Sequence, residues 1–328
     1  MTLQQFLDLW NDGSDTMSVQ TSGSTGAPKS LLVEKKRMLA SAKMTCDFLN
    51  LKKGDTALLC MSLEHIGAEM MVVRAIERKL NLINIPVDGH PMKHIETAPD
   101  FAAMVPLQVY NSLQNDEEKE KLKRIKHLII GGGGIGEKTQ DALKEFPNFV
   151  WSTYGMTETL SHIALRRLNG EDASDWYRPF ENVRLRLTAE NCLAITAPSV
   201  LNEEIITNDI AEIRDDGFFK ILGRKDNTII SGGVKIQIEE VERSLGIDNE
   251  PPKFAIGALG DEKFGQIVVL VCQNNLKSIL ENKIRSLHKY WQPKHIVCVD
   301  SIPTTDNGKI ARKRVDEIIK KYFDASNL

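Results

Sequence analysis

The chain has 328 residues, of which 41% are hydrophobic, and its formal net charge is −3. This length suits two domains, and the charge shows no excess of basic residues that would favour nucleic acid or an anionic membrane surface as a partner. No segment reaches the roughly 20 apolar residues that span a bilayer, and the start MTLQQFLDLWNDG lacks the basic end and apolar run of a signal peptide.

The cysteines are scattered, with no CxxC or Cys/His spacing, at Cys46, Cys60, Cys192, Cys272 and Cys298. Free thiols in a reducing compartment are favoured over a disulfide framework or a zinc site. We therefore expect a cytoplasmic protein with no nucleic-acid partner and no membrane span. The oligomeric state stays open, a homodimer being one alternative.

The first half of the chain alternates apolar, β-rich runs with helical patterns. The runs cover residues 55–61, 80–86, 126–134 and 149–155, and the helical patterns cover 65–79 and 137–146. This alternation predicts strands joined by crossover helices, hence an α/β sheet. Two of the strands run into glycine or turn clusters, and ligands of open α/β sheets gather at such carboxyl ends of strands.

After residue 183 the pattern changes to short alternating strands, at 183–190, 193–200, 211–217 and 218–224. A polar break at 225–227 precedes a final unit, which is predicted to contain a hairpin (227–236), a helix (238–246), two strands (253–260 and 266–272), another helix and a last strand (294–300). We place the boundary at Asp226, which gives a large domain over 1–225 and a small α+β domain over 226–328.

A loop dense in glycine and hydroxyl residues follows the extended run MSVQ. Its backbone N–H and side-chain O–H groups can surround phosphate, and a lysine at its end adds positive charge. It is not a Walker A loop, because Pro28 stands where that motif needs glycine. A Gly/Ser linker is the alternative. The candidate phosphate-binding residues are Thr21, Ser22, Gly23, Ser24, Thr25, Gly26 and Lys29.

A second motif, STYGMTET, stands at the end of the strand over 149–155. Tyr154 beside Gly155 can offer its ring to a flat base, and Glu158 supplies the hard oxygen ligand that Mg²⁺ prefers. The preceding Gly131–Gly134 run allows close approach to a planar ligand. A plain strand-to-turn junction is the alternative for both segments.

Two later motifs add charges. Asp209 in TND carries the carboxylate that usually pairs with a ribose diol, and Arg224 in GRKD can contact ribose or phosphate. Near the carboxyl end, the turn IPTTDNGKIAR presents Lys309. Surface charges and a solvated loop are the alternative interpretations of these pieces when each is taken alone.

In this order, the motifs resemble those of the adenylate-forming superfamily of acyl-CoA synthetases, adenylation domains and luciferases. The similarity runs from about residue 15 to residue 320, with GRKDNTIISGGVKIQIEEVE matching the hinge motif. It implies the adenylate-forming fold, in which a large α/β domain with a β-rich subdomain carries a small mobile carboxy-terminal domain. It also implies ATP and Mg²⁺ as cofactors and coenzyme A as the acyl acceptor.

The resemblance assigns a role to each matching position. Lys29 and its neighbours would bind the β- and γ-phosphates, and Tyr154 with Gly155, Gly132 and Gly133 the adenine. Thr157 and Glu158 would act at the catalytic centre, Glu158 holding Mg²⁺. Asp209 and Arg224 would bind the ribose. Lys309 would bridge the carboxylate and the α-phosphate during adenylation, because a cation offsets the repulsion between two anions.

The resemblance also implies two conformations of the small domain. Asp226 matches the hinge, and rotation about it would withdraw Lys309 and bring up the face around Gly232 and Gly233, which leave room for the pantetheine arm of CoA. One departure stands out. Relatives usually carry well over a hundred residues before the phosphate loop, whereas 20 stand here before Thr21, so we expect the first subdomain to be largely missing.

Short forms of this kind resemble o-succinylbenzoate-CoA ligases of menaquinone biosynthesis. The stretch from Met61 to Arg74 is similar to their acyl-pocket helix. Arg74 is the candidate for the carboxylate that is not activated, His65 for the activated end, and Ser161 with His162 for the pocket wall. Surface or core positions are the alternatives for Arg74 and His65, and other aryl or acyl acids stay open.

Three functions follow from the sequence. The leading one is an ATP-dependent acid-CoA ligase that forms an acyl-AMP, releases pyrophosphate and then makes the CoA thioester. A second is an adenylating enzyme that loads a carrier protein. The third is a degenerate relative that binds acyl-AMP or nucleotide as a sensor, which the joint presence of the motif residues disfavours.

Overall fold

The computed structural model describes residues 1–20, 30–305 and 308–326. The chain divides into two compact units, the first formed by residues 1–186, 194–205 and 213–220, and the second by 187–193, 206–212 and 221–328. The continuous part of the second unit begins at Ile221, close to the boundary predicted at Asp226.

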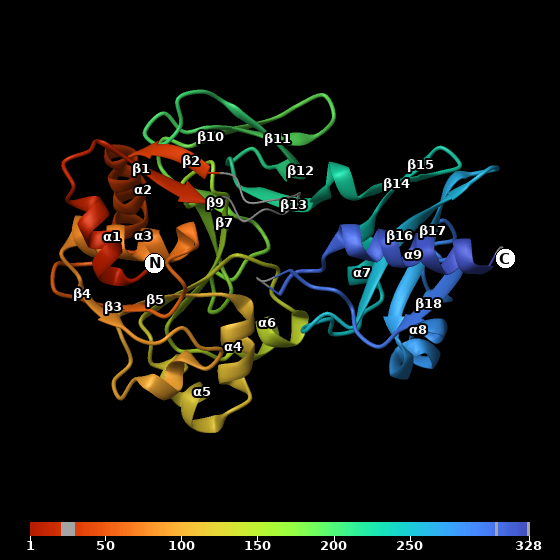
Figure 1. The fold of residues 1–328 in the computed structure, drawn as a ribbon, viewed down its shortest axis with the longest axis horizontal. Helices are drawn as coiled ribbons and strands as arrows, with labels where there is room; N and C mark the ends of the chain where they lie inside the picture. The colour runs from red at the N-terminus through yellow and green to blue at the C-terminus, as the bar shows by residue number, and fades with distance from the viewer. Residues whose placement is uncertain (21–29, 306–307, 327–328) are drawn as a thin grey trace. The chain divides into compact units, whose positions relative to one another are not determined.

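The first unit is built on a sheet with strand order β4-β3-β5-β6-β7-β8-β9 (Figure 1). The strands from β4 to β7 are parallel, whereas β8 is antiparallel to β7 and β9 to β8. Their bounds are β3 Thr56–Leu59, β4 Asn81–Asn84, β5 Phe101–Met104, β6 His127–Ile130, β7 Phe149–Gly155, β8 His162–Arg167 and β9 Arg178–Pro179. The predicted parallel α/β sheet is confirmed.

Helices connect the parallel strands, as parallel pairing requires. They are α3 Ile66–Arg78 between β3 and β4, the 3-10 helix η1 Pro91–His94 between β4 and β5, α4 Pro106–Leu113 and α5 Asp116–Lys123 between β5 and β6, and α6 Glu137–Lys144 between β6 and β7. Before the sheet come α1 Leu3–Trp10 and α2 Lys35–Phe48, separated by the antiparallel pair β1 Thr16–Gln20 and β2 Ser30–Glu34.

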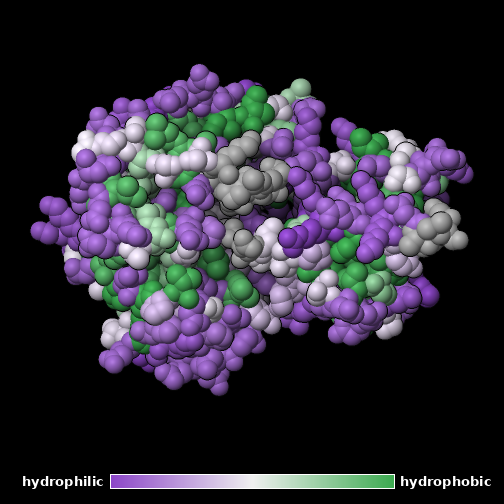
Figure 2. All heavy atoms as spheres, viewed as in Figure 1, coloured by the Kyte–Doolittle hydropathy of each residue, from purple (hydrophilic) through white to green (hydrophobic). Residues whose placement is uncertain are grey.

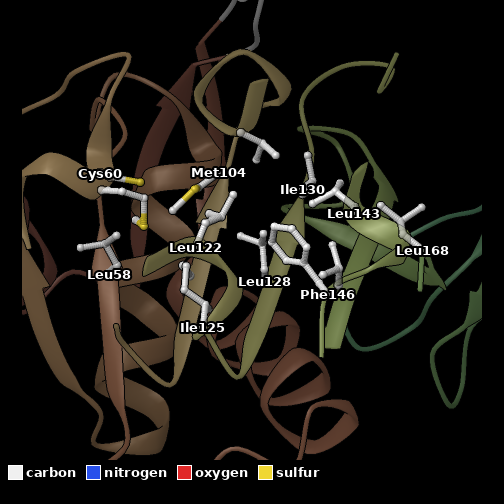
Figure 3. Packing of buried hydrophobic residues seen from close by; sticks show 14 of the residues in the cluster. Leu58, Cys60, Met104, Leu122, Ile125, Leu128, Ile130, Leu143, Phe146 and Leu168 are labelled. Carbon is white, nitrogen blue, oxygen red and sulfur yellow. The ribbon is translucent and has the colours of Figure 1, made fainter. Parts of the chain in front are cut away.

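One face of the sheet packs on the helices that follow β5 and β6. Its buried residues point toward one another in Figure 3, where Leu128 and Ile130 of β6 face Leu122 of α5 and Leu143 of α6. Alternate residues of β6 and β7 thus build this core, while the intervening ones face the other side. The parallel strands are fixed in register by this packing.

A second sheet has the strand order β10-β11-β12-β13, which follows the chain. Its strands are β10 Arg184–Leu187, β11 Cys192–Thr196, β12 Ile205–Ile213 and β13 Phe219–Arg224. Three of them match short strands predicted after residue 183, whereas the strand predicted over 211–217 overlaps β12 only at 211–213. The predicted turn between the last two is present, with Gly217 at a φ of +82°.

The second unit contains a sheet in which β17 pairs with β14, β16 and β18. Its elements are η2 Lys225–Asn227, β14 Thr228–Ser231, β15 Val234–Gln237, α7 Ile238–Ser244, β16 Phe254–Asp261, β17 Gly265–Gln273, η3 Asn274–Leu276, α8 Lys277–Ile284, β18 His295–Val299 and α9 Arg312–Ser326. The predicted elements are all present. The prediction missed α9, whose Val315 and Ile319 pack against the sheet.

The surface drawn in Figure 2 is mostly hydrophilic, and the hydrophilic lower edge of the first unit corresponds to α5. That helix reads DEEKEKLK and buries chiefly Leu122 on its inner face. Among the described residues, no helix is both long and apolar enough to cross a membrane. The five cysteines are free thiols.

Glu69 of α3 gives a test of this packing. The residue is 4% exposed, Oε2 has no hydrogen-bond partner among the described residues, and burial raises the pKa of the carboxyl from 4.5 to about 7. The folded state therefore binds this proton more tightly than the unfolded chain, so folding loses stability as pH rises from about 4.5 through 7.

We expect Glu69→Gln to remove this loss. Its stability relative to the native chain should increase between pH 5 and pH 8, by at most about 3 kcal/mol, since one pKa unit corresponds to about 1.4 kcal/mol. Urea unfolding at both pH values measures the difference, with the exposed Glu64→Gln as the control. A difference that does not change with pH would contradict the burial of an ionisable carboxyl here.

Candidate active site

Glycines line the carboxyl edge of the parallel strands. Gly131 follows β6 and donates its backbone N–H to the carbonyl of Met104 at 3.1 Å, and Gly132 adopts a φ of +83°. At Gly155 the pairing of β7 with β8 shifts register, and a Cβ there would lie 2.4 Å from the Cα of His162. Only glycine allows this close approach of two backbones.

Tyr154 lies just before that shift. Its ring packs edge-on against Phe219, with 5.1 Å between the ring centroids, and tilted against Tyr177 at 5.9 Å. Tyr177 and Phe219 are themselves joined by a pair of backbone hydrogen bonds. The ring predicted to face adenine is thus held by two aromatic neighbours that the sequence analysis missed, and Gly132, Gly133 and Gly155 belong to the adjoining strand ends.

The loop after β7 holds the predicted magnesium ligand. The buried Thr159 hydroxyl is 3.0 Å from both the backbone N–H and the carbonyl of Met156, and it also donates to the carbonyl of Ser161 at 2.6 Å. Thr157 is buried, whereas Glu158 is exposed at the tip. An exposed carboxylate on a braced turn suits a hard cation such as Mg²⁺.

The ribose candidates lie together in the second unit. Arg224 donates from Nε and NH2 to the two oxygens of Asp226, at 2.9 and 2.8 Å, and from NH1 to Oδ1 of Asp209 at 3.2 Å. These carboxylates raise the pKa of Arg224, the hydrogen bond from Asp226 being the largest cause. The guanidinium of Arg224 therefore joins Asp209, the predicted ribose ligand, to Asp226, the predicted hinge residue.

The hairpin of β14 and β15 turns at Gly232 and Gly233. Both have positive φ, +58° and +82°, as a type I′ turn requires, and Ser231 pairs directly with Val234. This is the face predicted to meet the pantetheine arm. Neither glycine has a side chain to obstruct a ligand there.

Lys309 lies on a second turn of the same unit. Thr305 donates its N–H to the carbonyl of Lys309, and Ala311 donates to that of Pro303, both at 2.8 Å. Desolvation and the charge of Arg224 lower the pKa of the ammonium group, with Asp209 acting in the opposite direction, although the residue as a whole is exposed.

A partly buried ion pair anchors the end of this turn. Arg312 donates from NH1 and NH2 to the two carboxylate oxygens of Glu242 on α7, each at 2.6 Å, and NH1 also reaches the carbonyl of Ile256 at 3.1 Å. Forked pairs of this kind fix geometry as well as adding energy. The segment that presents Lys309 is therefore tied to the core of the second unit.

The predicted acid-binding residues come from α3 and from the start of β8. Arg74 is 1% exposed and donates from NH2 to Oγ of Ser161 at 2.6 Å, while its Nε has no acceptor among the described residues. His65 is the exposed residue that precedes α3. Nine residues at 1.5 Å each place it about 13 Å from Arg74 along the helix axis.

The predicted phosphate loop lies outside the described residues, with Thr21, Ser22, Gly23, Ser24, Thr25, Gly26 and Lys29. The strands on either side are described, and Gln20 of β1 pairs directly with Ser30 of β2. The loop therefore joins the two strands of a hairpin.

A model of the family described as "AMP-binding enzyme" matches residues 9–194. The chain belongs to the AMP-binding enzyme family. The resemblance stated from its motifs is confirmed, and so are the α/β fold of adenylate-forming enzymes and membership of an enzyme family. The motifs of this AMP-binding enzyme that the match includes are those at 21–29, 131–134 and 152–159.

Three similar proteins illustrate the relationship. A solved structure of an "acyl-CoA synthetase (AMP-forming)/AMP-acid ligase II-like protein" from Dyadobacter fermentans is 31% identical, with a TM-score of 0.66, and the match covers 96% of this chain and 93% of that one. A 2-succinylbenzoate--CoA ligase of Bacillus cereus is 24% identical over 92% of this chain and 70% of its own. The o-succinylbenzoate coenzyme A synthetase of Bacillus subtilis, solved with ATP and magnesium ion, has a TM-score of 0.70 at 18% identity, covering 91% and 69% of the two chains.

The sequence analysis placed Ser161 and His162 at the acid pocket, but it did not find the hydrogen bonds that join them to Arg74 and Thr45. His162 is 6% exposed, with Nδ1 3.3 Å from Oγ of Ser161 and Nε2 3.0 Å from Oγ1 of Thr45 on α2. Thr45 stands 117 residues from His162 in sequence, so no local pattern joins them. The one local feature that could have pointed to this contact is Thr45 itself, a hydroxyl residue on the buried face of α2.

Proposed function

We propose that this AMP-binding enzyme is an ATP-dependent acid-CoA ligase whose acid carries a second carboxylate, most consistently o-succinylbenzoate. A carboxylate oxygen of the acid attacks the α-phosphorus of ATP and pyrophosphate leaves. The thiol sulfur of CoA then attacks the acyl carbon of the acyl-AMP, and AMP leaves. ATP and Mg²⁺ would be the cofactors, with Glu158 as the magnesium ligand.

The observation that carries the acid class is the burial of Arg74. Its guanidinium makes one short hydrogen bond to a neutral serine, and among the described residues no Asp or Glu contributes to its charge balance. Burial lowers its pKa to about 10, so it stays charged at neutral pH. A buried charge without a partner costs several kcal/mol, which an anionic ligand would offset.

The names of the relatives support the same acid. The Bacillus cereus protein is a 2-succinylbenzoate ligase, and that acid has two carboxylates of which one is activated. Arg74 would bind the second, Ser161 would line the pocket, and His65 would lie toward the activated end, as the length of α3 between His65 and Arg74 allows. Other aryl or acyl acids and a carrier-protein acceptor remain the alternatives.

We propose the remaining roles from the resemblance of the motifs. Lys29 and the loop from Thr21 would bind phosphate, Tyr154 the adenine, and Asp209 with Arg224 the ribose. Asp226 would be the hinge of the domain over 226–328. Arg224 donates hydrogen bonds to both Asp226 and Asp209. A ribose bound at Asp209 would therefore alter the hydrogen bonds of the hinge residue Asp226 through Arg224.

Thioester formation from o-succinylbenzoate, benzoate and medium-chain acids, measured side by side with ATP and CoA, tests the proposal. We expect o-succinylbenzoate to have the highest kcat/KM. Arg74→Gln should lower that value by roughly 30-fold or more, because truncating one partner of a buried charge pair costs about 2–5 kcal/mol. It should alter the value for 4-oxo-4-phenylbutanoate, which lacks the ring carboxylate, much less.

Arg78→Gln is the matched control, because Arg78 lies one turn further along α3 and pairs with Asp47 and Glu77. It removes a cation from the same helix without touching the proposed pocket. Equal losses for the two acids in Arg74→Gln, or for the two variants with o-succinylbenzoate, would contradict a carboxylate site at Arg74.

Lys309→Ala tests the division of the reaction into two steps. We expect it to lower acyl-AMP formation, followed as acid-dependent ATP–pyrophosphate exchange, by roughly 100-fold or more. Transfer of the acyl group from supplied acyl-AMP to CoA should change little. Lys313→Ala, an exposed lysine in the same segment, is the control, and equal loss of both steps in Lys309→Ala would remove Lys309 from its assigned role.

A further inference from the structure

A line of buried polar groups leads away from Arg74. Its NH2 is 2.6 Å from Oγ of Ser161, which is 3.3 Å from Nδ1 of His162; Nε2 of the same ring is 3.0 Å from Oγ1 of Thr45, which is 3.4 Å from the carbonyl oxygen of Ser41. The groups come from α3, the start of β8 and α2. Arg74, His162 and Thr45 are 1%, 6% and 0% exposed.

The direction of every hydrogen bond in this line can be assigned. The carbonyl of Ser41 can only accept, so the Thr45 hydroxyl donates to it and must accept from Nε2–H of His162. A neutral ring with its hydrogen on Nε2 accepts at Nδ1, so the Ser161 hydroxyl donates to it. Arginine only donates, so Oγ of Ser161 accepts from NH2 of Arg74.

The imidazole must be neutral for this arrangement. Burial and the nearby charge of Arg74 both hold the pKa of His162 well below its ordinary value. A protonated ring would present an N–H to Ser161 in place of an acceptor and would repel the guanidinium. A carboxylate in the same position could also orient Ser161, but it would neutralise Arg74 and compete with an anionic ligand.

We propose that His162 is a positioning residue for recognition of the second carboxylate, held in its Nε2–H tautomer by Thr45. It fixes the Ser161 hydroxyl, which engages NH2 of Arg74 and leaves Nε without an acceptor among the described residues. The neutral imidazole thereby orients the guanidinium without cancelling its charge. This inference rests on the proposed function, since it concerns the same dicarboxylic acid.

A plain packing role is the competing explanation. The ring of His162 packs edge-on against Phe180, with 5.5 Å between centroids, so replacement by phenylalanine keeps an aromatic ring there and removes the acceptor. Asparagine loses the ring but carries an oxygen near the position of Nδ1, which restores the acceptor. The two explanations therefore predict opposite orders for these variants.

The experiment measures the KM for o-succinylbenzoate and the inhibition constant of 4-oxo-4-phenylbutanoate, with ATP and CoA saturating. We expect His162→Phe to raise the ratio of KM to inhibition constant about three- to tenfold, the worth of one hydrogen bond, with kcat less affected. His162→Asn should restore most of the native ratio. Thr45→Val removes the acceptor that holds the hydrogen of His162 on Nε2, so this variant should also raise the ratio of KM to inhibition constant.

Each outcome separates the two proposals. If the native chain makes no thioester from o-succinylbenzoate, the proposed function fails, and this inference fails with it. If the native chain is active but the ratio stays at its native value in both His162→Phe and Thr45→Val, the inference alone is overturned. If His162→Phe also lowers the melting temperature, Thr45→Val decides between the two explanations. Valine and threonine have nearly equal volumes, so a raised ratio of KM to inhibition constant in Thr45→Val reports the lost hydrogen bond, and an unchanged ratio contradicts the inference.

Discussion

The proposed acid site depends on a guanidinium that is buried without a carboxylate beside it. Arg74 keeps its charge at neutral pH, and the groups described around it are a hydroxyl, a neutral imidazole and a thioether. Such a site is unfavourable in the empty protein and would become favourable if an anion entered, so the proposed site would exchange stability for recognition. The buried carboxyl of Glu69, on the same helix, adds to the cost of folding this region.

The sheet topology explains how these groups meet. The helix α3 lies between two parallel strands, whereas β8 returns antiparallel to β7 after the shift in register at Gly155. This reversal brings Ser161 and His162 back beside helices that lie far earlier in the chain. The loop that makes the reversal also carries Glu158 and follows Tyr154, so groups proposed for nucleotide, metal and acid leave one strand end.

Much of the fold was predictable because it is local. Alternation of apolar runs and helical patterns predicted the parallel sheet, and paired glycines predicted the hairpin at Gly232. The helix α9 was not predicted, although Val315 and Ile319, which pack on the sheet, stand at helical spacing in the sequence. The resemblance placed Ser161 and His162 at the acid pocket with Arg74, but their hydrogen bonds could not be predicted, because Ser161 is 87 residues from Arg74 and Thr45 is 117 residues from His162.

A crystal structure of the chain with a stable o-succinylbenzoyl adenylate analogue tests the central claim most directly. We expect the ring carboxylate to lie within hydrogen-bond distance of Nε of Arg74, with the hydrogen bond from NH2 to Ser161 retained. A ring carboxylate directed to solvent or to another cation, with Arg74 still lacking an anion, would contradict it.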